Sequence, residues 1–117
     1  MPETSIIAEL KDLAELAALR ISKQNLIFDF YAPWCVPCKA VGKALEDMTL
    51  ELQSYSAHVV RINVDIFQTA ATMYNVRSLP TLLFSKQVDS SGSPEIVGTY
   101  VGVLTKSQIQ QALAKHF

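Results

Sequence analysis

The sequence predicts an α/β fold: a central mixed sheet of four to five strands, flanked by helices on both faces. Three observations predict it. Short apolar runs at 26–31 and 58–64 are typical of strands buried on both faces. Amphipathic helical stretches lie before and between them, which favours parallel crossovers. A strong turn signal at 89–94 then predicts an antiparallel hairpin near the end. A length of 117 residues is the usual size of one compact domain, so we expect a single domain over 1–117.

The first elements are a short strand, a helix and a buried strand. The mostly apolar stretch 5–10 is expected to form an edge strand. From 11 to 21 apolar side chains recur at helical spacing with charged ones between them, which predicts an amphipathic helix. The run 26–31 is apolar and aromatic except for Asp29, and we expect a central strand there.

The middle of the chain is expected to contain a long helix, a second buried strand and a short helix. The long helix should begin near Cys35 and continue to about Ser54, with Gly42 permitting a bend. The second strand covers 58–64 and the short helix 69–74. Tyr74 and the methionines are interpreted as core residues.

The last part of the chain is expected to form a hairpin and a closing helix. A third strand follows Pro80, and Thr105 or Ser107 would cap the closing helix. The expected segments are strand 82–86, turn 89–94, returning strand 95–101 and helix 105–117.

Charge and hydropathy exclude several classes of protein. Ten basic and eleven acidic residues are scattered, with neither the basic cluster of a nucleic-acid binder nor an acidic tail. No apolar stretch approaches the roughly 20 residues that a membrane span needs. The N-terminus has no basic segment before an apolar one, so no secretion signal is expected and a cytoplasmic location is favoured. A mature form that had lost a transit peptide would read the same way.

The two cysteines, Cys35 and Cys38, carry the clearest functional signal. They are too close together for a disulfide between them to stabilise the fold much, so reactivity explains them better. At a helix N-terminus the pKa of the Cys35 thiol should fall, and Lys39 adds a nearby positive charge. Cys38 lies one turn later, within disulfide reach. Pro37 loses no hydrogen bond there. This arrangement supplies the attacking and resolving thiols of disulfide exchange, with no cofactor and no metal.

Four motifs in the right order resemble the thioredoxin family, over nearly the whole chain from residue 26 onward. They are W-C-x-P-C-K, the upstream F-D-F-Y-A, R-S-L-P-T-L-L-F and Y-V-G-V. The resemblance implies a monomeric protein-disulfide reductase of the thioredoxin fold. It would reduce disulfide-containing target proteins, and a thioredoxin reductase would regenerate its dithiol.

The resemblance also implies roles for individual residues. Cys35 would be the exposed nucleophile and Cys38 the buried resolving thiol. Asp29 would be a buried carboxylate beneath them whose raised pKa suits a proton acceptor for Cys38. Pro80 would be a cis-proline facing the cysteines, with the backbone at Leu79 pairing with an extended substrate segment. An apolar docking face would comprise Trp34, Val36, Pro37, Leu79, Val101, Gly102 and Val103.

This sequence departs from the family pattern at three positions. Val36 stands where the family usually has glycine, and we expect a changed reduction potential and partner preference but intact exchange chemistry. Tyr31 replaces a common tryptophan. Arg61 stands where bacterial relatives often have lysine. If Arg61 reaches Asp29, its permanent charge should hold that carboxyl ionised more firmly.

Other functions remain to be weighed against a reductase. A disulfide isomerase or oxidant of the same fold is separated from a reductase by reduction potential. A binding module would keep its partner without exchange activity. Half of a zinc site would need more ligands. The remaining candidates, His58 and His116, are badly spaced for one, and we expect both to be solvated.

Overall fold

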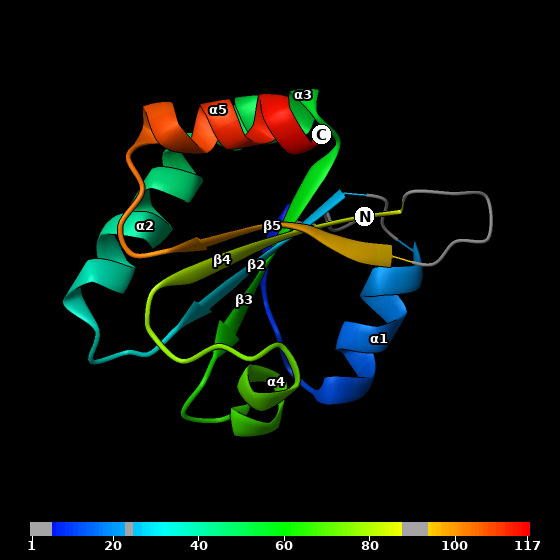
Figure 1. Cartoon of the computed structure of the whole chain (residues 1–117), viewed down its shortest axis with the longest axis vertical. Coiled ribbons are helices and arrows are strands. Elements are labelled where there is room, and N and C mark those ends of the chain that lie inside the picture. The colour runs from blue at the N-terminus through cyan, green and yellow to red at the C-terminus, as the bar shows by residue number, and fades with distance from the viewer. Residues whose placement is uncertain (1–5, 23–24, 88–93) are drawn as a thin grey trace, which may run out of the picture.

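A five-stranded mixed sheet forms the centre of the molecule, in the order β1-β3-β2-β4-β5 (Figure 1). The computed structural model describes residues 6–22, 25–87 and 94–117. Strand β3 pairs in parallel with both β1 and β2, whereas β4 pairs antiparallel with β2 and β5. The strands are β1 (Ile7–Glu9), β2 (Asn25–Tyr31), β3 (Ala57–Asn63), β4 (Thr81–Gln87) and β5 (Pro94–Val101). The predicted mixed sheet is confirmed, as is the edge position of the first strand.

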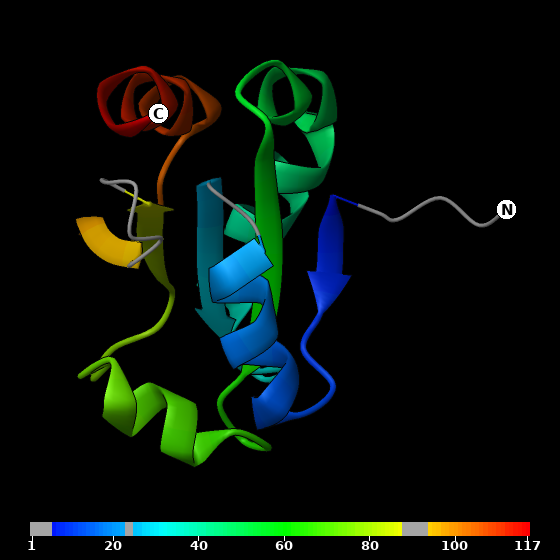
Figure 2. The ribbon, with the colours of Figure 1, turned by 90° about the vertical axis from the view of Figure 1, so that its right-hand side faces the viewer.

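Helices cover both faces of this sheet, as predicted (Figures 1 and 2). Side chains of α2, α3 and α5 fill one hydrophobic core, and those of α1 and α4 fill the other. The helices are α1 (Leu13–Ser22), α2 (Val36–Asp47), α3 (Thr49–Ser54), α4 (Gln68–Met73) and α5 (Lys106–His116).

Strand β2 lies between the two cores, which explains its almost continuous apolar sequence. Phe28 and Phe30 pack into the core under α1 and α4, while Ile27 packs into the core under α2 and α5. Because side chains alternate along a strand, Asp29 and Tyr31 lie on the same face as Ile27. This alternation places a buried carboxyl beneath the helix that begins at the cysteines.

The segment predicted as one helix from Cys35 to Ser54 is helical on both sides of Met48, and only its continuity was predicted wrongly. Helix α2 ends at Asp47, and the chain turns at Met48 before α3 begins. The Met48 N–H donates to the Leu45 carbonyl, three residues back, and the Thr49 hydroxyl donates to the Glu46 carbonyl. These local bonds replace helical ones and end α2. Helix α2 continues through Gly42, where the sequence permitted a bend.

The closing helix is capped as predicted, by Thr105. The Thr105 hydroxyl accepts from the Gln108 N–H at 3.1 Å, and the Gln108 side chain accepts from the Thr105 N–H at 2.9 Å. This reciprocal capping box satisfies two N–H groups that would otherwise lack partners. The predicted turn at 89–94 falls largely on 88–93, which lie outside the described residues.

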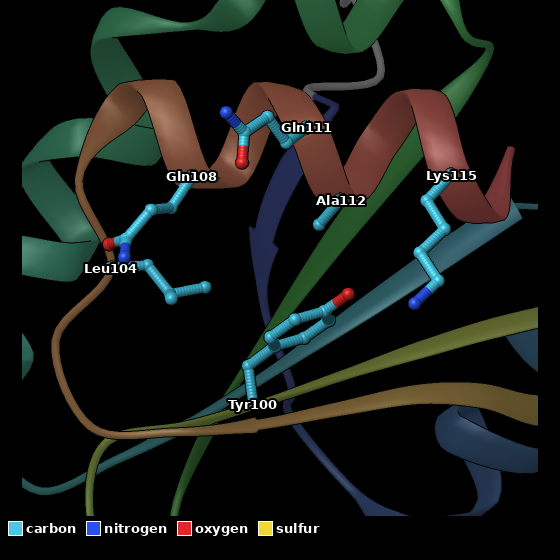
Figure 3. A pocket seen from close by; sticks show the side chains of 6 residues that line it. All are labelled: Tyr100, Leu104, Gln108, Gln111, Ala112 and Lys115. Carbon is cyan, nitrogen blue, oxygen red and sulfur yellow. The ribbon is translucent and has the colours of Figure 1, made fainter.

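Two side chains are not where the sequence suggested. Met73 is exposed rather than in the core, although Tyr74 beside it packs on Phe28. His116 is not a solvated residue. Its Nε2 lies 2.7 Å from the hydroxyl of Tyr100, which points toward α5 (Figure 3), and its ring packs on Phe84, so burial lowers its pKa.

Candidate active site

Cys35 and Cys38 form a disulfide at the N-terminus of α2, with their Cα atoms 5.3 Å apart. Cys35 is the N-cap residue of this helix, and its Sγ accepts a hydrogen bond from the Cys38 N–H at 3.2 Å. A sulfur held at this position interacts with the partial positive charge of the helix N-terminus. Pro37 lies in the first turn, where its missing N–H leaves no bond unmade. Lys39 is exposed in the same turn.

The two sulfurs differ in how well they are covered. Cys35 is 6% exposed and Cys38 only 1%. Cys35 is less exposed than the resemblance implied, because both cysteines pack in a small cluster with Ala32, Tyr31 and Leu79. The predicted order is nevertheless present, since Cys35 is the more accessible of the two.

The Asp29 side chain is completely buried and makes one ion pair. Arg61 Nε donates to Asp29 Oδ2 at 3.0 Å, because parallel pairing of β2 and β3 puts these two residues opposite each other. The second oxygen, Oδ1, has no hydrogen-bond partner among the described residues. Burial raises the pKa of Asp29 to about 6, although Arg61 acts to lower it. Arg61 thus reaches Asp29 and lowers its pKa in the direction expected for such a contact, but burial outweighs the arginine's effect.

Sequence reasoning missed the residues that surround the Arg61 guanidinium. Its carbon lies 4.1 Å from the centre of the Tyr31 ring, and the Tyr31 hydroxyl donates to the Glu9 carboxylate. Gly42 of α2 leaves space for the guanidinium, because a Cβ at this position would lie 3.0 Å from an Arg61 nitrogen. Only the register of β1 and β3, which pairs Glu9 with Arg61, could have indicated this grouping.

The Leu79–Pro80 peptide bond is cis, as the resemblance implied. Pro80 is buried immediately before β4, and its carbonyl accepts from the Gly102 N–H at 2.9 Å. Gly102 has a φ of 98°, a conformation that residues with a Cβ rarely adopt. Backbone geometry alone therefore favours glycine at this position. Leu79 packs against the cysteine cluster.

Exposed apolar side chains flank the cysteines in the sequence and flank Gly102, whose N–H bonds to the carbonyl of Pro80. The most exposed are Trp34, Val36, Val101 and Val103, and Pro37 is exposed too. Clustered exposed apolar side chains are typical of an interaction surface. Beside them runs an open groove of about 300 Å³. It is lined by Trp34, Cys35, Val64, Ala71, Val76, Arg77, Ser78 and Leu79.

Asp65 is a further residue of this surface that the sequence did not single out. Its carboxylate accepts from Trp34 Nε1 at 3.1 and 3.3 Å and so holds the indole in place. The predicted parallel pairing of the two buried strands could have indicated it, because β2 and β3 are parallel and pair Tyr31 with Asn63. Residues just beyond the ends of these two strands therefore meet at one edge of the sheet.

The described residues contain no group of three or more His, Cys, Asp or Glu side chains placed to hold a metal ion. None of their helices is both long and apolar enough to cross a bilayer.

Comparison with known proteins agrees with the geometry of this site. The sequence model of the thioredoxin family matches residues 9–115. The chain belongs to the thioredoxin family. Thioredoxin of Buchnera aphidicola subsp. Baizongia pistaciae is 36% identical over 110 residues, 94% of either chain. Thioredoxin of Bacillus subtilis is 38% identical over 95 residues, covering 81% of this chain and 85% of its own.

The fold comparison leads to the same family. The structure of Trichomonas vaginalis thioredoxin superposes with a TM-score of 0.79 and 25% identity, covering 96% of this chain and 98% of the other. Like its relatives, this thioredoxin-family chain is a thiol–disulfide oxidoreductase, and Cys35–Cys38 is its redox-active disulfide.

Proposed function

We propose that the chain is a protein-disulfide reductase in which Cys35 is the nucleophile, Cys38 the resolving thiol and Asp29 the proton acceptor. The observation that carries this proposal is the Cys35–Cys38 disulfide at the N-terminus of α2, the helix that covers the fully buried Asp29 and its ion-pair partner Arg61. The greater exposure of Cys35 supports its assignment as the nucleophile, because a target can approach Cys35 more readily than Cys38.

In the first half of the reaction the reduced protein attacks its target. The Cys35 thiolate attacks one sulfur of the target disulfide, that S–S bond breaks, and the other target sulfur leaves as a thiolate that takes a proton. A mixed disulfide between Cys35 and the target results. The helix N-terminus stabilises the Cys35 thiolate before the attack.

In the second half Cys38 releases the target. Asp29 takes the proton of the Cys38 thiol, and the resulting thiolate attacks the Cys35 sulfur. The mixed disulfide breaks and the second target sulfur leaves as a thiolate, which takes a proton. Two electrons and two protons have then passed to the target, and Cys35–Cys38 is the oxidised product. A pKa near 6 suits Asp29 to this task, and its Oδ1 has no competing hydrogen bond among the described residues.

The surroundings of this reaction are proposed on the family resemblance. The chain would act as one domain over 1–117 and as a monomer in the cytoplasm, as a carrier in electron transport. It would use no cofactor beyond its own disulfide. A thioredoxin reductase would return two electrons to Cys35–Cys38. Target proteins would lie with an extended segment along the backbone at Leu79 and with apolar groups against Trp34 and Val36.

Two measurements on the unmodified chain test this proposal. The reduced protein should reduce insulin disulfides catalytically with a reductant supply. Its reduction potential against glutathione should lie near or below the cytosolic poise of roughly −220 to −320 mV. A potential well above that range would instead indicate an oxidant or isomerase. Absence of any disulfide-exchange activity would indicate a binding role.

Replacing Val36 should weaken target binding while leaving the chemistry intact. Val36 is 72% exposed in the first turn of α2, so a docked target can bury it. Losing part of that burial costs about 1 kcal/mol, so Val36→Ser should raise the KM for insulin roughly fivefold with kcat unchanged. Steady-state kinetics check this.

A matched control for Val36→Ser lies near the other end of the same helical region. Leu50 of α3 is 78% exposed, and α2 separates it from the disulfide. Leu50→Ser should leave KM unchanged. Equal rises in KM for both variants would contradict a docking role for Val36.

A further inference from the structure

The Arg61 guanidinium is held by more groups than the ion pair with Asp29. It reaches Asp29 Oδ2 through Nε, and it lies over the Tyr31 ring with 4.1 Å between the guanidinium carbon and the ring centre. The Arg61 side chain is 23% exposed, so water competes for it. A guanidinium on an aromatic face gains about 0.5–2 kcal/mol, enough to favour one orientation of a long side chain.

Tyr31 is itself anchored at the edge of the sheet. Its hydroxyl donates to the carboxylate of Glu9 on β1, and its ring packs against the cluster that contains both cysteines. Burial, assisted by Glu9, raises the pKa of Tyr31 to about 12, so the hydroxyl keeps its proton at working pH. The chain of contacts thus runs from Glu9 through Tyr31 and Arg61 to the carboxyl of Asp29.

Among the described residues, the charges that shift the pKa of Asp29 are those of Arg61 and Glu9. The position of the Arg61 guanidinium therefore matters for this pKa. Arg61 on β3 lowers the pKa of Asp29, and Glu9 on β1 raises it by its charge. Strand β4 places the apolar Leu82 opposite Asp29. The charged residues of α2, the helix that covers this face, are all exposed: Lys39, Lys43, Glu46 and Asp47.

We propose that Tyr31 and Glu9 are positioning residues, which hold the Arg61 guanidinium on Asp29 and thereby set the pH range in which Asp29 can take the Cys38 proton. This inference rests on the proposed role of Asp29. Without the Tyr31 ring, Arg61 turns toward solvent and Asp29 keeps only the effect of burial. Its pKa then rises, and it is protonated, hence unable to accept a proton, over a wider acidic range.

The first test follows the Asp29 carboxyl carbon by NMR while the oxidised protein is titrated. Tyr31→Leu should raise the pKa of Asp29, Arg61→Ala should raise it at least as far, and the double variant should match Arg61→Ala alone. Tyr31→Phe keeps the ring and should show a smaller rise. An unchanged or lowered pKa in Tyr31→Leu, or additive shifts in the double variant, would overturn the role of Tyr31.

A second pair of variants separates the anchoring role of Glu9 from its charge. Glu9→Gln keeps an acceptor for the Tyr31 hydroxyl but removes the charge, whereas Glu9→Ala removes both. Loss of the charge lowers the pKa of Asp29 equally in the two variants. Anchoring therefore predicts a higher pKa in Glu9→Ala than in Glu9→Gln, and equal values would overturn it.

Kinetics provide a readout that a general structural defect would not imitate. The rate of target release from a preformed Cys35 mixed disulfide should fall about 3- to 10-fold in Tyr31→Leu at pH 5.5 and remain unchanged at pH 8, where Asp29 is ionised in both proteins. Equal losses at both pH values would overturn the proposal. If the unmodified chain reduces no insulin, the proposed reductase function fails. The NMR titration still decides the roles of Tyr31 and Glu9.

Discussion

Cys35→Ser is expected to lower insulin reduction to the uncatalysed background, a loss on the order of a thousandfold or more. A serine hydroxyl stays protonated at the helix N-terminus, so no nucleophile remains to open the target disulfide. The fold should survive, because a disulfide between residues three apart closes a very short loop and contributes little stability. Turnover of insulin and circular dichroism measure both outcomes.

Cys38→Ser is the matched partner of this variant, and it should fail in a different way. Cys35 can still attack, but nothing displaces the target, so covalent complexes should accumulate on incubation with oxidised insulin. Non-reducing electrophoresis and mass spectrometry detect them. Accumulation in Cys35→Ser, with none in Cys38→Ser, would reverse the two assigned roles.

Asp29→Asn is expected to stabilise the protein at neutral pH by about 2 kcal/mol. The pKa of Asp29 is raised in the folded state from 3.8 to about 6, so the folded protein binds this proton more tightly than the unfolded chain. The contribution of protonated Asp29 to the free energy of unfolding is therefore fully present below pH 3.8, and it is lost as the pH rises through 6. The loss is about 3 kcal/mol above pH 6. Asparagine carries no charge and so avoids this loss of stability. Part of the gain is offset because Arg61 loses its ion-pair partner.

Urea unfolding of the oxidised protein between pH 4 and pH 8 checks this expectation. The difference in unfolding free energy between Asp29→Asn and the unmodified chain should grow with pH and level off above about pH 7. Asp47→Asn is the control: this exposed carboxylate of α2 pairs with Lys43 and Lys106, which lower its pKa, so its loss should give no gain at pH 7. A gain at pH 4 as large as that at pH 8 would contradict the account of Asp29.

The same substitution should impair catalysis, since asparagine cannot take the Cys38 proton. A group that destabilises the fold yet occupies a completely buried position is typical of a functional site. Slower target release in Asp29→Asn, together with its greater stability, would identify Asp29 as a residue kept for the reaction.

Much of the fold could be predicted from local patterns. Apolar runs at β2 and β3, helical spacing in α1 and the cap at Thr105 depend on neighbouring residues, whose periodicity can be read directly. The break at Met48 could not be predicted this way. The apolar spacing of Leu45, Met48 and Leu52 suits one continuous helix, and only local hydrogen bonds interrupt it.

The sequence by itself determined the chemistry: two cysteines spaced by one turn at the start of a helix, a carboxyl within an apolar strand and a family pattern around them. Only the tertiary structure decided how that carboxyl is controlled. Arg61 lies 32 positions from Asp29, and Glu9 lies 22 from Tyr31. Parallel pairing of β1, β3 and β2 brings them together. Such contacts depend on strand register, which no local pattern specifies, and on the missing Cβ of Gly42, which admits the guanidinium beneath α2.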